Sequence, residues 1–136
     1  MSFSNTAETA INTHIFVGTA LPWAANTDLW LALHTADPGE AGTAATSEAA
    51  YGSYARQAIA RSGAGWTVTA NEAKNAALIQ FPECSSGSET ITHVSITTAV
   101  SGTSKILYSG ALSASRSVSS GIQPQFAAAA LTVTED

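Results

Sequence analysis

This 136-residue sequence is short of charge: Asp, Glu, Lys and Arg together make up 11% of the chain. The 5 basic residues are scattered and are outnumbered by 10 acidic residues, which leaves a formal net charge of −5. Binding to nucleic acid requires clustered lysines and arginines that neutralise phosphates. We therefore expect no nucleic-acid partner.

Cysteine and long apolar segments are scarce as well. Cys84 is the only cysteine, so no disulfide can form within the chain. We expect packing and self-association to supply the stability, in a chain made in a reducing cytoplasm. No basic segment followed by an apolar stretch opens the chain, and no apolar run approaches the ~20 residues that span a membrane. Neither a signal peptide nor a membrane partner is expected.

Large apolar side chains are few, because Leu, Ile, Val and Phe together account for about a fifth of the residues. Such a low fraction indicates disorder only when the net charge is also high, which it is not here. Alanine makes up much of the remaining apolar share, and serine and threonine dominate the polar share. A surface of this kind suits close packing against neighbouring subunits.

One helix is predicted, at the N-terminus. Asn5 and Glu8 have the spacing of a capping box, and Gly18 is a favourable end. The apolar residues that recur between them at helical spacing are Ala7, Ala10, Ile11 and Ile15.

Beyond residue 24 the sequence predicts about eight or nine short strands separated by turn residues. They cover residues 28–35, 54–61, 66–70, 77–81, 90–98, 105–109, 116–119, 123–126 and 130–134. No helix separates consecutive strands, which argues against a parallel α/β sheet. We predict one all-β domain over residues 1–136: a jelly-roll-like antiparallel β-sandwich over 24–136, preceded by a helical arm over 1–18.

A long loop over residues 36–52 is predicted between two of these strands. Asp37, Pro38 and Gly39 form a turn signal at its start. Asp37, Glu40 and Glu48 suggest a calcium site, but they are spread among alanines and threonines, and a solvated acidic loop accounts for them better.

Residues with the spacing of a metal or catalytic site are not apparent. The three histidines, His14, His34 and His93, lie in different predicted elements, and Cys84 has no partner at metal-ligand spacing. We interpret His34 as a solvated histidine at a strand end. There is no nucleophile-elbow motif and no phosphate-binding loop. We expect no cofactor and no enzymatic activity, although a small hydrolase remains a third hypothesis because Ser, His and Asp are all present.

Five segments, taken in order, resemble a family of short tailed-phage structural proteins, known as capsid-fibre, tail-fibre or head-decoration proteins. They are LALHTADPGEAG (31–42), YGSYARQA (51–58), THVSI (92–96), LYSGAL (107–112) and FAAAALTVTED (126–136). In that family glycine is frequent where this chain has Ser95 and Ala129. The resemblance implies a jelly-roll-like sandwich, no catalytic residues, and trimers seated over the joints between major-capsid subunits.

The leading hypothesis is a homotrimeric capsid decoration, or cement, protein on the outer capsid surface of the virion, assembled in the bacterial host cytoplasm. It would bridge and stabilise subunits of the major capsid protein. The alternative is a tail-fibre or baseplate-associated subunit that binds host-surface carbohydrate through Trp23, Trp30 or Trp66. The N-terminal helix could instead only close one end of the sandwich. The candidate contact residues are Phe3, Ile11, Ile15, Phe16, Trp23, Asp37, Pro38, Glu40, Tyr51 and Tyr54.

Overall fold

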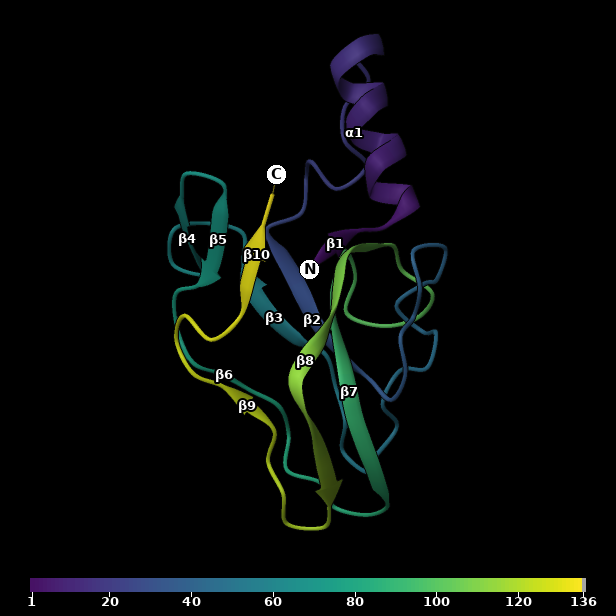
Figure 1. The fold of residues 1–136 in the computed structure, drawn as a ribbon, viewed down its shortest axis with the longest axis vertical. Coiled ribbons are helices and arrows are strands. Elements are labelled where there is room, and N and C mark those ends of the chain that lie inside the picture. The colour runs from purple at the N-terminus through teal and green to yellow at the C-terminus, as the bar shows by residue number, and fades with distance from the viewer. Residues whose placement is uncertain (136) are drawn as a thin grey trace.

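The computed structural model describes residues 1–135, which form one helix and ten strands (Figure 1). The helix is α1 (Asn5–Val17). The strands are β1 (Ser2–Phe3), β2 (Asp28–His34), β3 (Gln57–Ala60), β4 (Trp66–Thr69), β5 (Glu72–Asn75), β6 (Ile79–Gln80), β7 (Ser88–Thr97), β8 (Ile106–Ser119), β9 (Gln125–Phe126) and β10 (Thr132–Thr134). All strand pairs are antiparallel, so the predicted all-β sandwich with a short N-terminal helix is confirmed.

The strands form two layers around one core. A five-stranded sheet has the order β1-β8-β7-β2-β3, and two smaller sheets have the orders β10-β5-β4 and β6-β9. Leu31 and Val94 of the large sheet pack in one cluster with Ile79 and Val133 of the smaller sheets. The core therefore lies between the layers, as the apolar alternation along the strands predicts.

Strand β2 is buried on both faces at its end. Leu31 and Leu33 reach the core as predicted, but Ala32 and His34 on the other face are fully buried too. Residues 46–49 run back along this end of β2, and the amide of Ala49 donates to the carbonyl of Leu33 (2.8 Å). The prediction of a solvated His34 is wrong, because a returning loop covers the strand end.

Strand β8 is longer than predicted. Residues 105–109 and 116–119 were expected as separate strands, but the chain is extended from Ile106 to Ser119 and pairs with β7 through a register shift. The Gly, Ala and Ser residues between the two predicted strands have weak strand propensity, which pairing with β7 overrides. β5 was not predicted either; its polar residues are held between β4 and β10.

The helix begins at Asn5, one residue earlier than the predicted capping box places its start. Ser4, not Asn5, is the N-cap, and its side chain accepts a hydrogen bond from the amide of Ala7. Gly18 ends the helix as predicted, with a left-handed φ of 75° that a residue with a Cβ adopts at a cost.

Ala129 also has a left-handed backbone, with φ at 62°, in the turn before β10. Glycine, which is frequent at this position in the phage family that the sequence resembles, suits this conformation better than alanine does. Ser95 differs, because it lies fully buried within β7.

Candidate interaction surfaces

Helix α1 is attached to the sandwich by its first turn. The Ser4 hydroxyl donates to the carbonyl of Ile106 in β8 and accepts from the amide of Ala7. Ala7 is the one buried residue of the helix, and it packs with Trp23 and Leu107. From there the helix projects beyond the sheets at the upper end of the molecule (Figure 1).

The far end of the helix is apolar and exposed. Ile15, Phe16 and Val17 are 62%, 80% and 74% exposed. Successive residues of a helix point about 100° apart, so these side chains face three different sides. A neighbour that packs along one face would cover only part of this group, which we call the helix tip. A concave partner could cover all of it.

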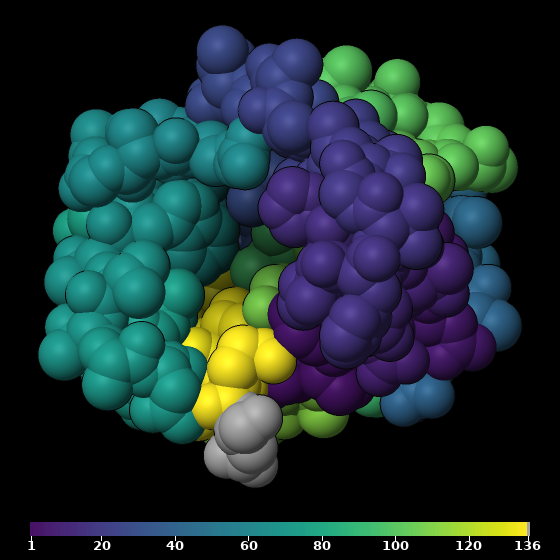
Figure 2. Space-filling view, turned by 90° about the horizontal axis from the view of Figure 1, so that it is seen from above, coloured from purple at the N-terminus to yellow at the C-terminus, as the bar shows by residue number. Residues whose placement is uncertain are grey.

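An apolar cleft of about 720 Å³ opens at the same end. Seen from above, a hollow lies between α1 and the β4–β5 pair, with the C-terminal strand at its edge (Figure 2). Its lining includes Leu29, Trp66, Val68, Ile96 and Val133. The indole N–H of Trp66 is buried and has no hydrogen-bond partner among residues 1–135. The helix tip and this cleft give the molecule one markedly apolar end.

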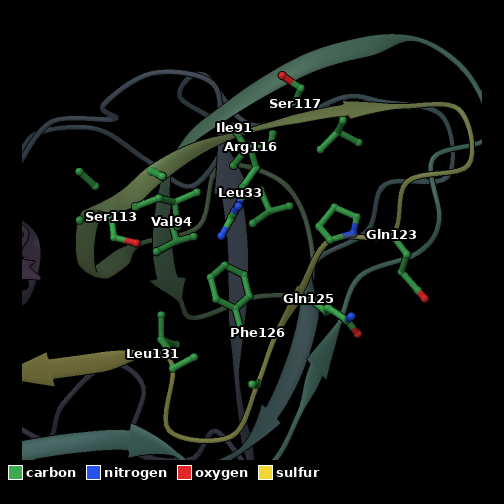
Figure 3. A pocket seen from close by; sticks show the side chains of 18 of the residues that line it. Leu33, Ile91, Val94, Ser113, Arg116, Ser117, Gln123, Gln125, Phe126 and Leu131 are labelled. Carbon is green, nitrogen blue, oxygen red and sulfur yellow. The ribbon is translucent and has the colours of Figure 1, made fainter.

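A second hollow, of about 680 Å³, runs along β8 and shares no lining residue with the cleft. Buried residues, including Leu33, Val94 and Leu131, form its floor. Arg116 extends from β8 toward the ring of Phe126 (Figure 3). We refer to this hollow as the Arg116 pocket.

The loop over residues 36–52 is fixed in place by a buried ion pair. The Arg56 guanidinium donates to both carboxylate oxygens of Glu48 (2.6 and 2.8 Å). It also donates to the carbonyls of Ala99 and Gly102, which joins this loop to the turn before β8. Charge-assisted bonds of this bidentate kind are among the stronger ones in proteins. The same carboxylate accepts from the hydroxyl of Tyr54.

His34 is enclosed in a polar niche beneath that loop. Its Nδ1 lies 2.8 Å from the carbonyl of Thr46, and its Nε2 lies 2.7 Å from the hydroxyl of Ser95. Burial lowers the pKa of His34 below its ordinary value of 6.5, although the Thr46 carbonyl acts in the opposite direction. Among residues 1–135, no three His, Cys, Asp or Glu side chains lie close enough together to hold a metal ion.

The tyrosines near this loop are kept protonated. Burial raises the pKa of Tyr51 to about 12. Burial also raises the pKa of Tyr54, whose hydroxyl accepts from the amide of Leu33 (3.1 Å). Both phenols therefore act as neutral structural groups.

A family model described as podophage GP4 fiber I protein gp80 matches residues 2–134. The chain belongs to this gp80 family. No curated protein matches the chain. Membership of the gp80 family makes the chain a phage structural protein of fibre type and implies a location in the virion.

The gp80 family supports the predicted resemblance in its general form. It confirms a phage structural protein, and its fibre description fits the fibre alternative at least as well as the decoration hypothesis. The described helix is neither long nor apolar enough to cross a membrane.

The predicted contact residues of this gp80-family chain fall into three groups. The exposed ones are Ile15, Phe16, Asp37 and Glu40. The partly buried ones are Phe3, Ile11 and Tyr54. The buried ones are Trp23, Pro38 and Tyr51, whose side chains are covered by this chain itself.

Asp37 forms the predicted turn, in which its Oδ1 accepts from the amide of Gly39 (2.8 Å). The predicted tryptophan set does not form one platform. Trp23 is buried in the cluster beneath the helix, Trp66 lines the apolar cleft, and Trp30 is partly buried on β2.

Sequence reasoning did not identify the Arg116 pocket. Arg116, Gln123, Gln125 and Phe126 come from β8, β9 and the turn between them, and no spacing in the sequence relates them to one ligand. The one available signal was Arg116 itself, an isolated charge within a run of Ser and Ala residues.

Proposed function

We propose that the chain is a structural, non-catalytic subunit of a phage fibre, fixed to the virion through its helical end. The observation that carries this proposal is the helix tip, in which Ile15, Phe16 and Val17 are each more than 60% exposed. Membership of the gp80 family supports the fibre role.

Exposing the helix tip to water is unfavourable. Full burial of an Ile, Phe or Val side chain contributes about 1.5–3 kcal/mol, so a concave apolar partner would gain substantially from all three. The rest of the helix surface is mostly polar, with Glu8 and His14 near its two ends. The helix tip is therefore an apolar group at the C-terminal end of a helix whose remaining surface is mostly polar.

We further propose that the chain assembles as a homotrimer. Three copies would present three helix tips to one particle, and repeated weak contacts gain avidity without a strong single contact. A trimer is also the form that the decoration alternative requires, with the major capsid protein as partner and the outer capsid surface as location. Residues 113–117 of β8 favour broad contact of that kind, because they are small or polar and all exposed.

The first experiment is complementation of phage that lack this gene. A variant with Ile15, Phe16 and Val17 all changed to Ser should fold normally but be incorporated into particles at least tenfold less, as measured by quantitative immunoblotting of purified virions. The matched control changes Leu78 and Val100, which are 52% and 61% exposed elsewhere on the surface, to Ser. Normal incorporation of the tip variant would refute attachment through the helical end.

Two further measurements test the oligomeric state and the location in the virion. Light scattering of the purified protein should give the mass of a trimer, and a monomer would refute that part of the proposal. A particle reconstruction separates the two locations: density at the tail supports the fibre role, and density spread over the capsid surface supports decoration.

A further inference from the structure

We infer that Arg116 keeps the free edge of β8 from pairing with the same edge of a second copy of this chain. The inference goes beyond the attachment proposed above and does not depend on it. It is carried by the place of Arg116 on an unpaired strand edge, with its side chain directed over the apolar core. No carboxylate of residues 1–135 forms an ion pair with it.

The outer edge of β8 is open over its second half. β1 covers only the first half, where it pairs at Tyr108 and Ser109, and Met1 lies against Gly110. Beyond that point β7 is the only strand of residues 1–135 that pairs with β8. An unpaired edge offers its backbone N–H and C=O groups to any extended chain. The same edge of a second copy is such a chain, and it is present wherever the protein is concentrated.

The edge that could accept a new strand is short. Between Ala111 and Arg116 the register with β7 shifts, because residues 112–115 bulge from the strand. Regular pairing with β7 returns over residues 116–119. Arg116 is therefore the first residue of the stretch that a second copy could extend.

The side chain of Arg116 points inward from this edge. Alternate residues of a strand face the same side, and Val118, two residues further on, is buried in the core cluster. In Figure 3 the guanidinium group extends into the Arg116 pocket, toward the ring of Phe126. Ser117 and Ser119 occupy the outward positions, so Arg116 is the one charged residue of this stretch.

The alternation of side chains determines how two such edges would meet. Directly opposed residues of an antiparallel pair share a face, so Arg116 would lie opposite either Arg116 or Val118 of the second copy. In both registers two guanidinium groups would enter one covered apolar space. β8 contains no Asp or Glu, and no acidic side chain lines the pocket. Burying two cations without a counter-ion costs more than a short strand pair contributes.

The competing explanation is that Arg116 only covers the core with the apolar stem of its side chain. The two explanations differ in one respect, because only the exclusion of a second copy depends on the charge. Arg116→Met keeps a long unbranched stem and removes the charge. Arg116→Lys keeps both.

The test is sedimentation equilibrium of the full-length variants over a range of concentrations. Arg116→Met should double the mass of the parent species and self-associate about tenfold or more tightly than the parent protein, because no charge is then buried at the contact. Arg116→Lys should keep the parent mass. Each variant is compared with the parent protein, so the result can be interpreted whether the parent is a monomer or the proposed trimer.

The matched control is Lys105→Met, which makes the same change of charge and adds the same side chain at an exposed residue outside the pocket. It should keep the parent mass. Both methionine variants make the net charge of −5 more negative by one unit, so weaker general repulsion cannot explain association. Hydrogen exchange locates the contact, since amides within residues 116–119 should gain protection in Arg116→Met.

The inference fails if Arg116→Met keeps the parent mass, or if Arg116→Lys associates as strongly as Arg116→Met. It also fails if Lys105→Met associates equally, since added apolar surface would then be the cause. Protection that appears only outside β8 would place the contact elsewhere and would refute the inference as well. Circular dichroism checks the fold of each variant, and Arg116→Leu repeats the test with a second uncharged side chain.

Discussion

At the scale of single residues, His34 shows how a polar side chain is accommodated in a core made mostly of small groups. A carbonyl oxygen only accepts, so the contact with Thr46 places the proton of the neutral ring on Nδ1. The Nε2 of His34 then accepts from the Ser95 hydroxyl. The sequence could not reveal this niche, because Thr46 and Ser95 come from segments far apart in the chain.

The buried His34 makes stability dependent on pH. Burial lowers its pKa in the folded protein, so below about pH 6.5 the unfolded chain binds a proton that the folded chain excludes. The free energy of unfolding should therefore fall as the pH drops from about 7.5 to about 5. Urea titrations at each pH measure this slope.

Two variants assign that slope to His34. His34→Gln should lower stability at neutral pH and flatten the slope, because the titrating group is gone. His14→Gln is the matched control, because it replaces an exposed histidine outside the niche. An equal slope in His34→Gln and the parent protein would show that other groups cause the pH dependence.

At the scale of elements, local pattern located the helix but not its exact start. The spacing of Asn5 and Glu8 predicted one cap, whereas Ser4 takes this role because its hydroxyl also reaches Ile106 of β8. The sequence predicted two strands where β8 is one. The extended form of β8 depends on pairing with β7, and not on the propensities of its own small residues. Contacts distant in sequence decided both cases.

The cap at Ser4 has a measurable energetic role. Ser4→Ala removes the acceptor for the Ala7 amide and the donor to the Ile106 carbonyl, both in a buried setting. We expect a loss of about 1–2 kcal/mol in the free energy of unfolding. Asn5→Ala, at the next position, should cost less than about 0.5 kcal/mol because the Asn5 side chain is exposed. Chemical denaturation of both variants makes the comparison, and equal losses would contradict the assignment of the cap.

At the scale of the whole molecule, the two hollows lie in separate places: the apolar cleft at the helical end and the Arg116 pocket along β8. The sandwich and helix were predictable because apolar periodicity and turn residues report on them directly. The hollows were not, because each is enclosed by segments from several strands. The exposure of the helix tip likewise follows only from the structure, in which Phe16 is 80% exposed.

The attachment of α1 by its first turn also determines how the protein would bear load. A force applied at the helix tip passes in one direction through Ser4 and the two-residue strand β1 into β8, and in the other along the chain into β2. β1 pairs with β8 at only Ser2 and Phe3, so this joint is the first to part under tension. Tension at the tip would therefore peel the N-terminal segment from β8 first, and the chain over residues 18–27 would still join the tip to β2 of the folded sandwich.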